Sequence, residues 1–211
     1  MNKDELEKLT RELHVENQKR YDNFITELNE ESDRGASIFA ATFFEVKLKE
    51  ILSELLRKDE VTDNMLEGAN GGLNTFSARI NICYVLGYIT KDEKHELNMI
   101  KNIRNKFAHN FHFKFSFMEP KVSDICKSFN AKLPQGKTLR DFTSRELFVN
   151  AVINLHSLLI DRHYEVMTFS SPNFNIEKYL NDPDAYKNAG RDQQLLEEYK
   201  EQLKREGKYP Y

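Results

Sequence analysis

Three residues near the middle of the chain, Arg104, Asn105 and His109, are of types that could do chemistry together. Asn105 and His109 are four positions apart, so in a helix their side chains lie above one another on a single face. The long Arg104 side chain can reach around the end of such a helix. Arginine offers a permanently charged planar donor that suits phosphate oxygens, and histidine can exchange protons near neutral pH. These residues predict acid–base chemistry beside a bound phosphate.

The same residues also have a purely structural interpretation, which the sequence leaves open. The C-terminal end of a helix carries a partial negative charge that attracts cations and favours a protonated imidazole. Arg104 and His109 would then only complement that charge.

The segment that carries these residues has strong helix signals. Thr90 followed by Glu93 is a capping box, which predicts the start of a helix. Apolar residues then recur at helical spacing and predict one buried face. They are Leu97, Ile100, Ile103, Phe107 and Ala108. Asn110 is the expected C-terminal cap, so the helix should end at the three candidate residues.

Four blocks of sequence resemble a known family. They are Asp33-Arg34-Gly35-Ala36, Phe76-Ser77-Ala78-Arg79-Ile80, Gly87-Tyr88-Ile89 and Ile103-Arg104-Asn105-Lys106-Phe107-Ala108-His109. In this order, across roughly residues 30 to 115, they resemble the mannitol operon repressor family. The shorter pattern of Arg104, Asn105, a spacer and His109 is similar to the motif of the HEPN superfamily, of which that family is a branch.

The resemblance implies a metal-independent endoribonuclease of the HEPN kind that acts as a dimer. His109 would accept the proton of the ribose 2′-hydroxyl or protonate the leaving oxygen, and Arg104 would hold the scissile phosphate. Asn105 would orient the side chain of His109 or that of Arg104. The resemblance also implies three supporting residues, which are Arg79, Asp33 and Arg34. Arg79 interrupts an otherwise apolar helix, and Asp33 is its expected partner. Enzymes of this kind often act as toxins or in defence against phage, restrained by a protein partner.

The family name implies an alternative function, a transcriptional regulator without catalysis that acts through protein–protein contacts. The net charge of −3 provides no global basic field, and no segment resembles a helix-turn-helix with a basic recognition helix. Direct DNA binding is therefore not expected. The expected partners are a second copy of the chain, RNA as a possible substrate, and a protein that serves as antitoxin or regulatory partner.

Composition favours an all-α fold. Charged residues make up 31% of the 211-residue chain, and glycine and proline are few. We expect an up-and-down helical bundle over residues 1–170, with an extra N-terminal helix, and a tail over 171–211 with a short amphipathic helix. The helices are expected near 3–30 (with a break at His14-Val15), 35–58, 75–89, 90–109, 120–129 and 143–168. Alternating phenylalanines from Phe111 to Phe117 predict an extended segment with one Phe-rich face.

No cofactor or metal is expected. Cys83 and Cys126 lack metal-ligand spacing and are expected to be buried free thiols in a reducing cytoplasm. His156 and His163 are seven positions apart, a poor spacing for joint metal binding, and are expected to be structural. The first twenty residues are charged throughout and no apolar run approaches transmembrane length, so we expect a cytoplasmic protein without membrane contact.

Overall fold

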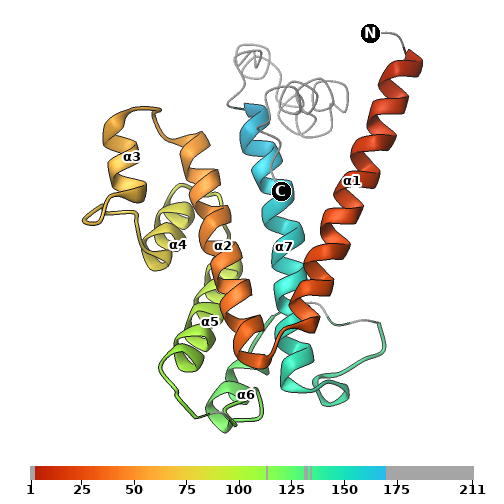
Figure 1. The fold of residues 1–211 in the computed structure, drawn as a ribbon, viewed down its shortest axis with the longest axis vertical. Coiled ribbons are helices and arrows are strands. Elements are labelled where there is room, and N and C mark those ends of the chain that lie inside the picture. The colour runs from red at the N-terminus through yellow and green to blue at the C-terminus, as the bar shows by residue number, and fades with distance from the viewer. Residues whose placement is uncertain (1–2, 113, 131–132, 134, 170–211) are drawn as a thin grey trace. The chain divides into compact units, whose positions relative to one another are not determined.

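The computed structural model describes residues 3–112, 114–130, 133 and 135–169. Over these residues the fold is all-α, as predicted, and no strand occurs among them. The helices, labelled in Figure 1 except for the short 3-10 helix η1, are α1 (Lys3–Glu30), α2 (Asp33–Leu55), α3 (Glu60–Glu67), α4 (Phe76–Val85), α5 (Lys91–Ala108), α6 (Pro120–Cys126), η1 (Leu139–Asp141) and α7 (Ser144–Phe169).

The chain forms two compact units. One comprises Met1–Ile25 with Tyr164–Tyr211, and its described part is most of α1 and the last residues of α7. The other, Thr26–His163, contains all the helices between them. The break predicted in the first helix is wrong, because α1 runs through His14 and Val15 without interruption. Neither residue is a glycine or proline, the types that interrupt a helix most strongly. The helix predicted in the tail lies outside the described residues.

Helix α2 is the centre of the larger unit. It packs most extensively against α5, and it also contacts α3 and α4. Small side chains at Ala36, Ala40 and Ala41 are buried and let neighbouring helices approach closely. The large apolar side chains of α2 fill the core beside them. These are Phe44, Leu48, Ile51 and Leu52, all fully buried.

Helix directions place three helix ends and helix α6 together. In Figure 1, α2 and α7 run upward and α5 runs downward. The N-terminal ends of α2 and α7, the C-terminal end of α5 and helix α6 therefore lie at the lower end of the unit. Hydrogen bonds join these ends: Arg34 donates to the carbonyl of Asn110, and Arg145 pairs with Asp33 at 2.6 Å.

The predicted start of α5 is confirmed. The Thr90 hydroxyl accepts from the Glu93 N–H at 3.2 Å, and the Glu93 carboxylate accepts from the Thr90 N–H at 2.7 Å. The helix ends one residue earlier than predicted, because its C-cap is His109 rather than Asn110. Before it, α4 ends at Val85, and Gly87 in the turn that follows has a φ of 80°, a left-handed conformation that suits glycine.

Residues 109–119, which we call the connector, join α5 to α6. The prediction of an extended Phe-rich segment is wrong, because the N–H of Phe115 donates to the carbonyl of His112 at 3.1 Å and forms a turn. Phe117 is buried, with its ring centre 5.1 Å from that of Phe107, whereas Phe111 is 87% exposed. The turn overrides the period of two, so Phe111 and Phe117 do not share one face; Phe113 lies outside the described residues.

Candidate functional site

The three motif residues lie together at the C-terminal end of α5. His109 is exposed, and Arg104 and Asn105 are half-buried. The backbone N–H of His109 donates to the carbonyl of Asn105 at 3.0 Å. Within the described part of the chain, the side chains of the three residues form no hydrogen bond or ion pair. They are therefore available to an external ligand, and none of them holds another in a fixed geometry.

The stretch of sequence around the motif is basic although the whole chain is acidic. Residues 97–118 contain four Lys or Arg and no Asp or Glu. One of them, Lys101, donates to the Ser77 hydroxyl at 2.8 Å, and both burial and the nearby charge of Arg104 lower its pKa. The sequence shows this local charge as a stretch without Asp or Glu. The net charge of the whole chain does not reveal it.

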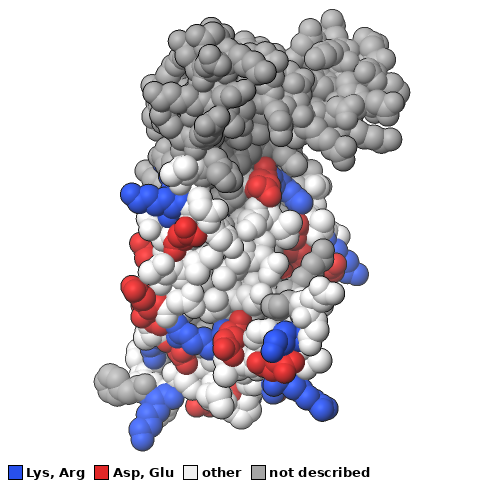
Figure 2. All heavy atoms as spheres, turned by 90° about the vertical axis from the view of Figure 1, so that its right-hand side faces the viewer, with Lys and Arg blue, Asp and Glu red and all other residues white. Residues whose placement is uncertain are grey.

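Other parts of the surface have mixed charge. On the face drawn in Figure 2, the blue Lys and Arg side chains and the red Asp and Glu side chains are interspersed. The described residues of that face form no extended basic surface of the kind that attracts nucleic acid by charge alone.

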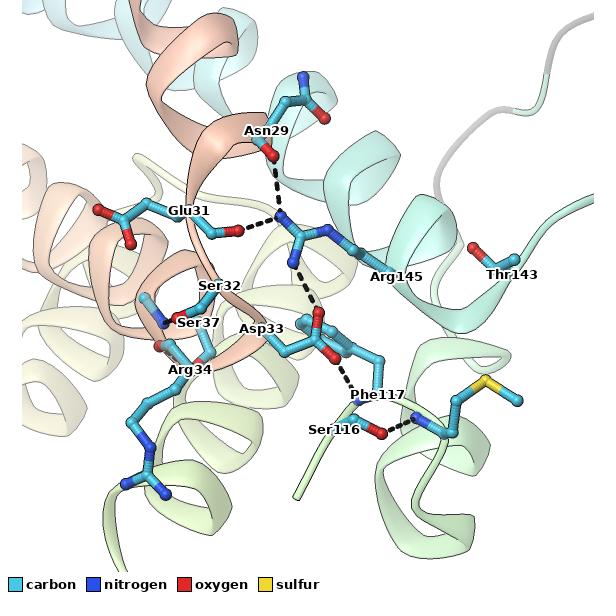
Figure 3. A network of polar contacts seen from close by, with 12 residues as sticks. Asn29, Glu31, Ser32, Asp33, Arg34, Ser37, Ser116, Phe117, Thr143 and Arg145 are labelled. Carbon is cyan, nitrogen blue, oxygen red and sulfur yellow. Dashed lines mark hydrogen bonds and ion pairs between the residues drawn. The ribbon is translucent and has the colours of Figure 1, made fainter. Parts of the chain in front are cut away.

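Arg34 is the predicted supporting residue that the structure brings to the end of α5. Its guanidinium donates to the carbonyl of Asn110, the residue directly after His109. Figure 3 shows the Arg34 side chain pointing away from the neighbouring Asp33 carboxylate. Arg34 therefore links the first turn of α2 to the connector.

Asp33 belongs to a different set of contacts (Figure 3). Its carboxylate accepts from Arg145 at 2.6 Å and from the backbone N–H of Phe117 at 3.0 Å. Arg145 also donates to the carbonyls of Asn29 and Glu31, at 3.1 and 2.6 Å. The predicted pairing of Asp33 with Arg79 is wrong, because Asp33 is committed to the start of α7 and to the connector.

Arg79 is a structural residue of α4. It is 7% exposed and donates to three backbone carbonyls, those of Leu73 at 2.9 Å, Glu45 at 3.1 Å and Leu66 at 2.9 Å. The Glu45 carboxylate lies 3.9 Å away. The bond to Leu66 caps the C-terminal end of α3, where carbonyls have no partner within the helix. None of these partners belongs to α5, so the contacts of Arg79 do not involve the motif.

A surface pocket of about 590 Å³ lies beside the connector. Its lining residues are Ser32, Asp33, Arg34, Phe111, Lys114, Phe115 and Ser116. None of the three motif residues lines it. Sequence reasoning missed this pocket, because it is formed by the non-helical connector against the first turn of α2, two segments that are far apart in the chain.

A buried charged cluster lies between α2 and α7. The ammonium of Lys47, which is 2% exposed, lies 2.5 Å from the Glu50 carboxylate and 3.5 Å from Nδ1 of His163. Burial and the charge of Lys47 lower the pKa of His163 to about 3 and that of His156 to about 4. His156 stacks on Phe43 with ring centres 4.9 Å apart. Both histidines are buried within the fold, which agrees with the structural role predicted for them.

The described residues contain no group of three or more His, Cys, Asp or Glu side chains that could hold a metal ion. Cys83 and Cys126 are buried free thiols, as predicted. Burial raises the pKa of each thiol to about 12, so neither is a nucleophile near neutral pH. In the same part of the chain, no helix has the length and apolar character needed to cross a membrane.

Comparison with known proteins finds a similarity at the level of the fold. No family model matches the chain, and no curated protein matches it. The fold is similar to a chain in the X-ray structure of the MtlR–HPr complex from Escherichia coli, with a TM-score of 0.54 and 18% sequence identity. The similarity covers 66% of this chain and 97% of that chain.

Proposed function

We propose that this chain is a regulatory module without catalytic activity that acts by binding another protein. The observation that supports this most is the fold similarity over 97% of a chain from the MtlR–HPr complex. MtlR is a mannitol operon regulator, and the complex pairs it with HPr. We therefore propose HPr as the partner to test for this chain.

The connector offers a surface that suits a protein partner. Phe111 is 87% exposed and Met118 is 76% exposed, and the nearby Lys114 and His109 are exposed too. Exposed aromatic and methionine side chains are enriched in protein interfaces, where the surrounding rim is polar or charged. The partner would then offer an apolar pocket with an acidic rim.

Isothermal titration of the full chain with purified HPr tests this proposal. We expect saturable binding with a stoichiometry of one HPr per chain. Heat of dilution alone across the titration, together with separate elution of the two proteins in size-exclusion chromatography, would contradict it.

The endoribonuclease implied by the HEPN resemblance is the second candidate. It is favoured by one observation, that His109 is exposed and the side chains of Arg104 and Asn105 have no hydrogen bond or ion pair among the described residues. His109 would accept the proton of a ribose 2′-hydroxyl, whose oxygen attacks the phosphate held by Arg104; the bond from phosphorus to the 5′-oxygen would break, and a second group acting as an acid would protonate that leaving oxygen. One histidine per chain does not easily serve as both acid and base, so this mechanism needs a dimer with two motifs at one cleft.

An RNA cleavage assay in EDTA separates the two candidates. A nuclease of this kind would leave 2′,3′-cyclic phosphate ends, and His109→Ala would slow it by about 10²-fold or more. His112→Ala is the matched control, since His112 is an exposed histidine of the same connector. The regulatory proposal predicts no cleavage above background, with the folds of both variants intact.

A further inference from the structure

The connector pocket contains two positive side chains without a carboxylate partner. Arg34 is half-buried, and its hydrogen bond among the described residues is to the carbonyl of Asn110. Lys114 is exposed. In the part of the chain that the structure describes, neither side chain forms an ion pair. Both charges therefore lie at the pocket without a counter-ion from the protein.

One acidic residue lines the pocket, but its charge is already balanced. Asp33 accepts from the guanidinium of Arg145 at 2.6 Å and from the N–H of Phe117 at 3.0 Å. Arg145 does not line the pocket. The pocket thus keeps the positive charge of Arg34 and Lys114, which attracts an anion.

The lining also has hydrogen-bond donors to spare. The bond to Asn110 uses Nη2 of Arg34, and a guanidinium has five N–H donors in all. The hydroxyl oxygens of Ser32 and Ser116 accept from the backbone N–H groups of Gly35 and Met118, so both hydroxyl protons remain able to donate. A planar guanidinium beside hydroxyl and ammonium donors suits the oxygens of a phosphate group.

The remaining lining is aromatic. Phe115 is half-buried with its ring edge against Phe107, at a distance of 5.0 Å between ring centres, and Phe111 lies at the opening to solvent. A pocket of about 590 Å³ is within the range of small-molecule sites and exceeds what a phosphate ion alone would fill. The aromatic side chains provide a surface for an apolar part of the ligand.

We propose that this pocket binds a small phosphate monoester that carries an aromatic or apolar group. Arg34 and Lys114 bind the phosphate, the hydroxyls of Ser32 and Ser116 donate to it, and Phe115 contacts the apolar part. Phe111 and Lys114 also belong to the connector surface proposed for a protein partner, but the phosphate site needs no partner and is lined by none of the three motif residues.

Titration of the ¹⁵N-labelled full chain with phenyl phosphate, followed by NMR, tests the site. We expect saturable shifts at the amides of Ser32, Asp33, Arg34 and Ser116. Inorganic phosphate should bind at the same amides at least several-fold more weakly, and phenol should not produce these shifts. Absence of saturable shifts at millimolar phenyl phosphate overturns the proposal, and equal affinity for inorganic phosphate overturns the apolar part of it.

Charge-removing variants make the test specific. Lys114→Gln and Arg34→Gln should each raise the dissociation constant of phenyl phosphate by about 10-fold or more, since each removes a charged phosphate contact. Lys114 is exposed, so Lys114→Gln keeps the test valid if Arg34→Gln disturbs the fold. The controls are Arg57→Gln and Lys91→Gln, exposed residues beyond the C-terminal end of α2 and at the start of α5. Unchanged affinity in Lys114→Gln would overturn the assignment.

Discussion

At the residue scale, Arg79 shows how a charged side chain is kept inside a helical fold mainly by backbone carbonyls. Its three carbonyl partners come from α2, from α3 and from the loop before α4. The Arg79 side chain thus joins three separate segments of the backbone. Burial of a charge costs free energy unless its donors are used, and here the guanidinium replaces water as the partner of all three carbonyls.

Arg79→Ala should lower the free energy of unfolding by roughly 2–4 kcal/mol, because several buried carbonyls lose their donor at once. Arg79→Lys should restore only a small part of the lost stability, since an ammonium group lacks the planar guanidinium geometry that donates to three separate carbonyls. Urea unfolding followed by circular dichroism measures both. Arg57→Ala is the control, because the Arg57 side chain is 89% exposed. If Arg79→Ala and Arg57→Ala both unfold at the same urea concentration as the parent, the hydrogen bonds of Arg79 contribute nothing to the stability of the fold.

The buried histidines of α7 give a second residue-scale expectation, which concerns pH. Burial and the Lys47 ammonium lower the pKa of His163 and His156 to about 3 and about 4, below the usual 6.5. The groups that face them include Lys47 and Glu50 of α2. As pH falls below 6.5, the unfolded chain binds protons that the folded chain does not, so stability is lost on acidification.

Between pH 7 and pH 5 each histidine should contribute a loss of about 2 kcal/mol in the free energy of unfolding. His163→Gln should therefore reduce the difference between the two pH values by about that amount. Urea unfolding at both pH values checks this, with the exposed His95→Gln as the control. An identical pH dependence in His163→Gln and the parent would mean that folding does not lower the pKa of His163.

At the element scale, Arg145 and Asp33 join three elements at the lower end of the larger unit. Arg145 lies in the first turn of α7, Asp33 lies at the start of α2, and the N–H of Phe117 brings in the connector. The carbonyls of Asn29 and Glu31 add the end of α1 and the turn that follows it. This network sets where the connector lies relative to α2, and thereby forms the pocket.

The coupling between Arg145 and Asp33 should be measurable in a double-mutant cycle. Because the two side chains are each less than a third exposed and lie 2.6 Å apart, we expect a coupling energy of about 1 kcal/mol or more. The variants are Arg145→Met, Asp33→Asn and the pair, followed by urea unfolding. Arg140→Met is the matched control, since Arg140 is exposed in η1. If the effects of Arg145→Met and Asp33→Asn on the free energy of unfolding are additive, the two side chains do not stabilise each other.

At the scale of the whole molecule, the helices could be predicted and most tertiary pairings could not. The capping box at Thr90 and the apolar periodicity after it are local signals, so the start of α5 followed from the sequence. The pairing of Asp33 with Arg145 joins residues far apart in the chain, and no local pattern encodes it. The conformation of the connector was predicted wrongly for a related reason, that contacts with distant residues decide it. Its alternating phenylalanines indicate a strand, but packing of Phe117 on Phe107 and the turn at Phe115 prevail.

The candidate site was predicted in part. The motif residues lie at the end of α5 as expected, and Arg34 lies beside them, but Asp33 and Arg79 have other partners. Catalysis by Arg104, Asn105 and His109, assembly as a homodimer and RNA as a substrate stay predictions, because each depends on a second molecule.

The affinity of the chain for HPr, measured for connector variants, tests the central claim most directly. We predict saturable binding of purified HPr to the parent chain, and a dissociation constant raised about 10-fold or more by Phe111→Ser and by Met118→Ser, because exposed apolar anchors dominate protein interfaces. Val85→Ser is the matched control, since Val85 is 74% exposed at the end of α4, and it should bind HPr like the parent. Lack of HPr binding by the parent chain, or equal binding by all three variants, would contradict the proposal.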